Sequence, residues 1–263
     1  RSDTPQRISA PDLGPVEHVN AARLTFQSYR DNNYEIYVAN GDSSIETRVT
    51  NNSASDIEPR LSRGADRIVF ASKRDGNYEI YGVGIDGSNL RRLTYEASDD
   101  LDPNWSPNGA RIVFSTMRNG NSDIYVMNAD GGGLTRLTTD GADDYSPSWS
   151  PDGNSIVFIS ERGAPANTGG RVWLMNADGS NQHQLYDAPF AGGPMFSPDG
   201  GRIAFQADMN TDYWLDLAWM NATGGVAYVT AWGSAQWLTD QVMGSWSPDG
   251  KYIAATSLLY GYC

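Results

Sequence analysis

The stretch "LDPNWSPNGARIVFSTMRNGNSDIYVMNADGGGLTRLT", residues 101–138, contains the unit from which most of the chain is built. A related stretch, "YSPSWSPDGNSIVFISERG", begins 44 residues later at residue 145, and "IEPRLSRGADRIVFASKRDG" begins 44 residues earlier at residue 57. A fixed period of this length indicates an array of similar structural units.

A short apolar triplet marks the same position in each copy of the unit. Its six copies end at Phe26, Phe70, Phe114, Phe158, Phe205 and Ala255, at successive spacings of 44, 44, 44, 47 and 50 residues. Nine residues before these ends stand Leu61, Trp105, Trp149, Phe196 and Trp246, whereas the first copy has Glu17 and is degenerate. We expect these aromatic residues and the phenylalanines to pack between neighbouring units.

Each unit predicts four short strands, called A to D here. In one unit the residues up to Trp149 predict strand A, and "SPDG" at 150–153 predicts a reversing turn, because Pro fixes φ near −65° and Gly accepts positive φ. The triplet 156–158 predicts strand B and residues 172–173 predict strand C. "RLT" at 136–138 predicts strand D of the preceding unit. Four strands per unit are typical of a propeller blade.

We therefore predict an all-β fold, a single six-bladed β-propeller domain over residues 1–263. The blades are expected to start near residues 15, 59, 103, 147, 194 and 244. The motifs "WSPDG", "IVF", "S-x-R-x-G", "DIYVMNADG" and "RLT", in that order over roughly residues 15–255, resemble the repeat of TolB-type β-propellers, a WD-like family. This resemblance implies six blades around a central channel and an extracytoplasmic protein, periplasmic or secreted. The start at Arg1 fits a removed signal peptide or a shortened chain.

The sixth blade is expected to be incomplete, because Ala255 lies only eight residues before the end of the chain. Residues 6–9, "QRIS", resemble the "RLT" of strand D, so residues 4–10 are predicted to close the blade, with residues 257–262 as a candidate strand C. Two further interpretations stay open. The open edge could pair with a neighbouring chain, in self-association or a larger assembly, or the terminus could be short and capped.

Composition excludes several classes of function. The net charge of −13 disfavours nucleic acid as a partner, and no apolar run is long enough to insert into a bilayer. The only cysteine is Cys263, so no intrachain disulfide can form. His18 and His183 fall in different blades, and the sequence contains no HExxH motif, no G-x-S-x-G motif and no glycine-rich phosphate loop. We therefore expect a protein that is not an enzyme and has no cofactor.

Insertions suggest where a partner binds. The turns between strands A and B keep their length, whereas the extra residues of blades four to six fall in B–C and D–A connections, which an antiparallel blade places on the opposite face. Aromatic residues gather there. The binding-face candidates are Tyr213, Trp214, Trp232 and Trp237. Trp219 aligns with core positions and is better explained by packing.

Two charged patterns also recur. Asp12, Asp56, Asp100 and Asp144 are spaced by 44 residues just before strand A. They could form a cation ring for Ca²⁺, but local hydrogen bonds that fix the turn before strand A explain them better, and no metal site is firmly predicted. Arg30, Arg74 and Arg118 are expected to form ion pairs within their blades with Glu35, Glu79 and Asp123, respectively, and Arg162 continues the series.

These observations favour a non-catalytic extracytoplasmic propeller that binds a protein partner or serves as a structural scaffold, as a subunit of a larger assembly. A carbohydrate-binding or lyase-like propeller that uses the channel mouth and the Trp-rich loops is the alternative.

Overall fold

The computed structural model describes residues 23–30, 32–41, 45–165, 168–187, 189–208, 216–229, 239–247 and 249–258. All regular elements in these ranges are β-strands. No helix long and apolar enough to cross a membrane occurs among them. The candidates Asp12, Tyr213, Trp214, Trp232 and Trp237, and the proposed closing strand at residues 4–10, lie outside the described residues.

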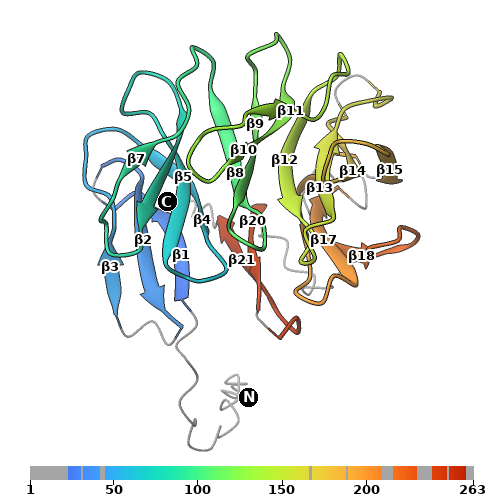
Figure 1. Cartoon of the computed structure of the whole chain (residues 1–263). Helices are drawn as coiled ribbons and strands as arrows, with labels where there is room; N and C mark the ends of the chain where they lie inside the picture. The colour runs from blue at the N-terminus through green and yellow to red at the C-terminus, as the bar shows by residue number, and fades with distance from the viewer. Residues whose placement is uncertain are drawn as a thin grey trace, which may run out of the picture.

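The described strands form six antiparallel sheets in chain order, arranged as a ring (Figure 1). The first blade consists of β1 (Arg23–Ser28), β2 (Glu35–Asn40) and β3 (Glu46–Arg48). The second consists of β4 (Asp56–Leu61), β5 (Arg67–Ser72), β6 (Glu79–Gly84) and β7 (Arg91–Arg92). The third consists of β8 (Asp100–Trp105), β9 (Arg111–Thr116), β10 (Asp123–Asn128) and β11 (Thr135–Arg136).

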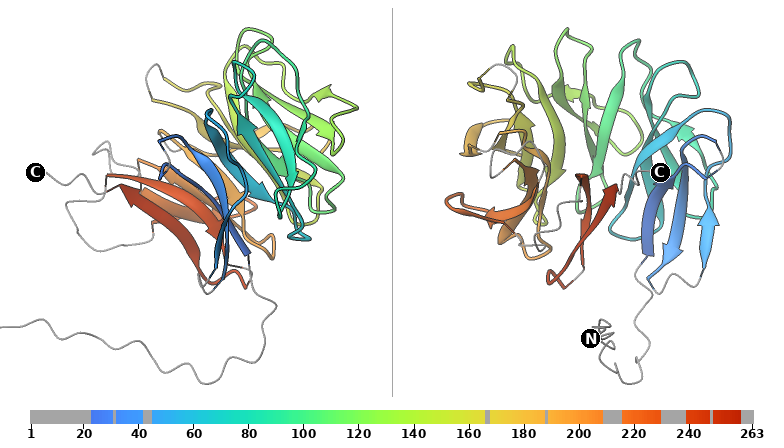
Figure 2. Two further views of the ribbon diagram at one scale, coloured as in Figure 1. Left: turned by 90° about the vertical axis from the view of Figure 1, so that its left-hand side faces the viewer. Right: turned by 180° about the vertical axis from the view of Figure 1, so that it is seen from behind.

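The later sheets follow the same order of strands. The fourth blade consists of β12 (Asp144–Trp149), β13 (Ser155–Ser160), β14 (Arg171–Asn176) and β15 (His183–Tyr186). The fifth consists of β16 (Gly192–Phe196), β17 (Arg202–Ala207), β18 (Asp216–Asn221) and β19 (Ala227–Val229). The C-terminal hairpin pairs β20 (Thr239–Trp246) with β21 (Ile253–Leu258), and it lies between the fifth blade and the first (Figure 2).

The predicted number of six blades is wrong for the described chain, which has five blades and a two-stranded hairpin. Four blades have four strands each, and the first has three because the residues expected to form its strand A lie outside the described ranges. Ser257 and Leu258, expected in a strand C, belong to β21 and pair with β20. Strand β21 is therefore longer than the apolar triplet that predicted it. The inner strands of the later sheets begin a few residues before the predicted blade starts.

The core lies between consecutive blades, as expected from the aromatic repeat. Phe70, Phe114, Phe158 and Phe205 are fully buried. Trp105, with Ile112 and Phe114 of the third blade, packs against Val69 and Leu93 of the second. Strand B is buried along nearly its whole length, because both of its faces are covered by neighbouring blades. Trp219, in turn, packs with Trp246 between the fifth blade and the hairpin.

Backbone hydrogen bonds confirm the predicted division into two faces. Ala129 N in a C–D turn donates to Ala110 O in the A–B turn of the same blade, at 2.9 Å, and Ala177 N donates to Asn154 O at 2.9 Å. At the other end of the blades, B–C loops bond to the loops that precede strand A, as in Glu161 N to Asp143 O at 2.9 Å. We call the first end the turn face and the second the loop face.

Candidate binding site

The turn face is built from rigid A–B turns. In the fourth blade the Ser150 hydroxyl donates to Asp152 Oδ1 at 2.5 Å and accepts from Ser155 N at 2.9 Å. Gly153 N donates to Ser150 O at 2.9 Å, and Gly153 has a φ of 74°, which is why glycine is needed there. The turn therefore satisfies its own polar groups and holds its outer surface in place.

Neighbouring A–B turns lie against one another through a proline and a glycine. A Cβ atom on Gly153 would lie 3.6 Å from Cδ of Pro107 in the preceding blade, and one on Gly200 would lie 3.7 Å from Cδ of Pro151. The turns of the third, fourth and fifth blades thus form a continuous rim at the turn face.

The rim changes at the second blade, whose turn reads "SRGA" at 62–65 where the fourth reads "SPDG". Arg63 therefore occupies the position of the proline. Arg67 makes the contact with the next turn instead: its Nη2 donates to Gly109 O at 3.1 Å, and its guanidinium lies 4.6 Å from the ring centre of Trp105. Arg63 is left exposed and is not needed to hold the rim together.

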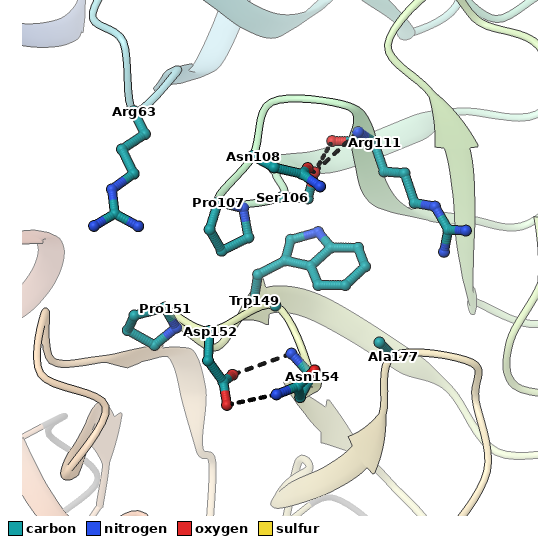
Figure 3. A pocket seen from close by; sticks show the side chains of 11 residues that line it. Arg63, Ser106, Pro107, Asn108, Arg111, Trp149, Pro151, Asp152, Asn154 and Ala177 are labelled. Atoms are coloured by element: carbon teal, nitrogen blue, oxygen red, sulfur yellow. Dashed lines mark hydrogen bonds between the residues drawn. The ribbon is translucent and has the colours of Figure 1, made fainter.

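A hollow of about 770 Å³ opens between the turns of the second, third and fourth blades (Figure 3). Its walls comprise Arg63, Ser106, Pro107, Asn108, Arg111, Trp149, Pro151, Asp152, Gly153, Asn154 and Ala177. Arg63 reaches in from one side and Arg111 lies on the other, with Pro107 and Trp149 between them (Figure 3). Both arginines are exposed.

The hollow carries positive charge in a chain of net charge −13. Among the described residues, neither the Arg63 guanidinium nor the Arg111 guanidinium has a hydrogen-bond or ion-pair partner. The third-blade turn has Asn108 where the fourth has Asp152, so one carboxylate faces two guanidinium groups. Two hydrogen bonds hold that carboxylate in its own turn, from the Ser150 hydroxyl to Asp152 Oδ1 at 2.5 Å and from Asn154 Nδ2 to Asp152 Oδ2 at 2.9 Å. The hydrogen bond from Ser150 also lowers the pKa of Asp152.

Trp149 forms a wall of this hollow and is only 7% exposed. Its Nε1 has no partner among the described residues, whereas Trp105 Nε1 donates to Arg60 O at 3.2 Å. A buried indole N–H without a partner is uncommon in folded proteins. The ring itself is covered, so it offers no open aromatic surface to a ligand.

The inner strands carry a second polar arrangement. Glu58, Asp102 and Ser146 occupy equivalent bulges of β4, β8 and β12, with φ of 55°, 54° and 52°. Asp102 N donates to Glu58 Oε2 at 2.7 Å, and Ser146 N donates to Asp102 Oδ2 at 3.1 Å. Burial and the nearby Asp102 carboxylate raise the pKa of Glu58 to about 7. These bonds link three consecutive blades.

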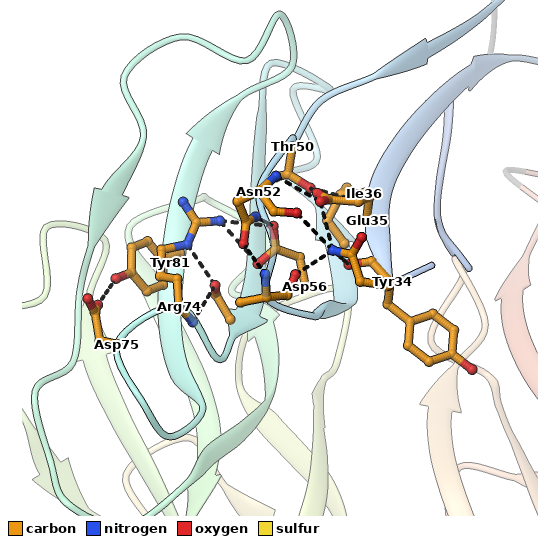
Figure 4. Close-up of polar contacts among 12 residues, drawn as sticks. Tyr34, Glu35, Ile36, Thr50, Asn52, Asp56, Arg74, Asp75 and Tyr81 are labelled. Atoms are coloured by element: carbon orange, nitrogen blue, oxygen red, sulfur yellow. Dashed lines mark hydrogen bonds and ion pairs between the residues drawn. The ribbon is translucent and has the colours of Figure 1, made fainter. Parts of the chain in front are cut away.

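The aspartates considered for a cation ring are bound to arginines. Asp56, Asp100 and Asp144 are fully buried. Arg74 Nη2 lies 2.9 Å from Asp56 Oδ2, as Figure 4 shows, and equivalent pairs join Arg118 to Asp100 at 3.0 Å and Arg162 to Asp144 at 2.6 Å. The described residues contain no group of three or more His, Cys, Asp or Glu side chains placed to hold a metal ion.

The predicted partners of these arginines are wrong, although the pairs do lie within blades. Glu35 pairs with Arg48 at 3.0 Å, Glu79 with Arg92 at 2.8 Å and Asp123 with Arg136 at 2.7 Å. Each of these carboxylates on strand C is thus bound by the arginine of strand D. The arginine after strand B instead reaches strand A, or, in the first blade, Glu46.

Sequence reasoning did not select Arg63 or Arg111 and assigned Trp149 to the core alone. A signal for Arg63 was present, because it is the residue that replaces proline in an otherwise regular turn. No comparable signal marks Arg111, since arginine or another polar residue is common at that position of the repeat.

Comparison with known proteins agrees with this fold. The sequence matches the TolB beta propeller domain over residues 2–104 and 98–206. TolB from Acinetobacter baumannii is 19% identical with a TM-score of 0.72, over 90% of this chain and 63% of that protein. The putative TolB from Agrobacterium tumefaciens is 23% identical with a TM-score of 0.70, over 91% of both chains. An oligogalacturonate lyase in complex with manganese is 14% identical, with a TM-score of 0.64 over 87% of this chain and 65% of that one. No curated protein sequence matches.

Proposed function

The chain belongs to the TolB β-propeller domain family, and we propose that it is a non-catalytic binding module that holds a segment of another protein at its turn face. The family likeness supports a binding module, and the resemblance of its repeats supports an extracytoplasmic location. The chain spans 63% of the length of the A. baumannii TolB.

The hollow at the turn face is the observation that supports this proposal most strongly. Its volume of about 770 Å³ suits several side chains of an extended segment, and its rim is fixed by turn hydrogen bonds rather than by a ligand. A preformed site of this kind loses little conformational entropy when a partner binds. Its lining residues offer no nucleophile–base pair, which fits binding better than catalysis.

The carbohydrate alternative draws on the fold shared with the oligogalacturonate lyase. Sugar sites usually present an open aromatic ring, and Trp149 is 7% exposed. Carbohydrate binding through the Trp-rich loops would involve residues outside the described ranges, and binding of the full chain to a glycan array tests it. Self-association through the edge of β21 stays a prediction, which sedimentation over a concentration series addresses.

Site-specific photo-crosslinking tests the proposed function. A photoreactive amino acid replaces the exposed Asn108 at the rim of the hollow, and the matched control replaces the exposed Glu161 on the loop face. Both variants are irradiated in an extract of the organism that carries the gene, and cross-linked peptides are sequenced by mass spectrometry. The proposal predicts one defined protein cross-linked from position 108 and not from position 161. Cross-links only from position 161, or none to protein from either position, would contradict it.

A further inference from the structure

We propose that the segment bound in the hollow is acidic, and that its Asp or Glu carboxylates pair with Arg63 and Arg111; this inference rests on the function proposed above. The two guanidinium groups lie on opposite sides of the hollow, with Pro107 and Trp149 between them (Figure 3). An extended segment crossing from one to the other would place carboxylates near both.

Several other arginines have partners within the chain. Arg74, Arg118 and Arg162 are bound to fully buried aspartates, and Arg67 holds the neighbouring turn. Arg63 and Arg111 have no such internal partner in the part of the chain that the structure describes. Arg91 on β7 also lacks a carboxylate partner among the described residues, so what sets Arg63 and Arg111 apart is that both line one hollow. Carboxylates of a bound partner would supply hydrogen-bond acceptors to both guanidinium groups.

The form of the charge favours carboxylates of a peptide. A guanidinium group presents paired N–H donors that match the two oxygens of a carboxylate. A long polyanion would be repelled by the net charge of −13. A short acidic segment would interact mainly with the two arginines, because at physiological ionic strength salt screens charges that are more than about 8 Å apart. The Asp152 carboxylate also faces the hollow, but it already accepts hydrogen bonds from Ser150 and Asn154.

The covered ring of Trp149 weighs against an acidic sugar in this hollow. Exposed polar groups of Asn108 and Asn154 and the edges of Pro107 and Pro151 suit an extended backbone instead. A uronic-acid oligosaccharide is therefore treated as a competing outcome of the experiment.

Fluorescence anisotropy tests the proposal on the full chain. The probe is a fluorescein-labelled peptide of alternating Glu and Ser, and the control peptide has Gln in place of Glu. The protein variants are Arg63→Gln, Arg111→Gln and the double variant. The matched control is Arg91→Gln, which removes an exposed arginine on β7 that lines a different pocket. Thermal melting checks that every variant is folded.

The wild type and the Arg91→Gln variant should bind the Glu peptide, with weaker binding as salt is raised. The double variant should bind about tenfold more weakly, and each single variant should fall between. The Gln peptide should not bind, and millimolar inorganic phosphate or an oligogalacturonide should not displace the Glu peptide. Equal binding by the double variant, equal binding of the Gln peptide, or displacement by either competitor would overturn the proposal.

The two proposals can fail separately. A protein cross-linked at position 108 through a segment without Asp or Glu would overturn the acidic segment and leave the binding module standing. Absence of any protein cross-link at that position would overturn the binding module itself.

Discussion

The carboxyl group of Glu58 makes the stability of the propeller depend on pH in a predictable direction. Its pKa rises from 4.5 to about 7 because burial and the Asp102 carboxylate disfavour its charged form. The folded protein therefore holds this proton more tightly than the unfolded chain. The stabilisation is complete below about pH 4.5 and is lost as the pH rises through about 7. The difference corresponds to about 3 kcal/mol of unfolding free energy.

The substitution Glu58→Gln should remove this dependence, because the amide oxygen can still accept the hydrogen bond from Asp102 N. Urea unfolding followed by tryptophan fluorescence at intervals from pH 5 to pH 8 measures it. The free energy of unfolding of the variant relative to the wild type should rise by about 2–3 kcal/mol across this range. Aspartates with lowered pKa values, such as Asp152, titrate below this range and do not obscure the effect.

The matched control is Glu161→Gln, the same chemical change at an exposed carboxyl group. It should run parallel to the wild type at every pH. If the Glu58→Gln curve also runs parallel to the wild type, or falls relative to it at high pH, the assigned rise in the pKa of Glu58 is wrong.

Three further substitutions test the packing between blades, a buried ion pair and a turn by chemical unfolding. Trp105→Ala should lower the free energy of unfolding by about 3–5 kcal/mol through a cavity between the second and third blades, and a loss below about 1 kcal/mol would remove it from the core. Asp100→Ala should cost about 3–5 kcal/mol, because it removes the buried carboxylate of Arg118 and leaves only the exposed Glu96 at 3.7 Å; a smaller loss than that of the exposed Glu46→Ala would contradict this. Gly153→Ala should cost about 1 kcal/mol, because the turn requires a φ of 74°, and an unchanged midpoint would argue against this turn geometry.

Much of the fold could be predicted because its signals are local. Apolar triplets, turn residues and the fixed period each report on a few neighbouring positions, and burial of strand B on both faces produces the apolar triplet at its centre. The blade count failed at the last copy of the repeat. In the described part of the chain, the triplet ending at Ala255 belongs to a two-stranded hairpin and not to a four-stranded blade.

The ion pairs and the candidate site show the same limit. Arg118 was assigned to Asp123, five residues away, yet its carboxylate is Asp100, 18 residues away and brought close by the pairing of β8 with β9. The hollow was missed for a related reason. Insertions directed attention to the loop face, whereas Arg63 marks the turn face through a single exchange of proline for arginine.

Hydrogen–deuterium exchange of the full chain, with and without the Glu-containing peptide, tests most directly that the turn face is the binding surface. The predicted result is slower exchange in residues 62–67, 106–111 and 150–155, with unchanged exchange in the loop-face segments 73–78 and 117–122. Slower exchange confined to the loop-face segments, or no change at the three turns at saturating peptide, would contradict it.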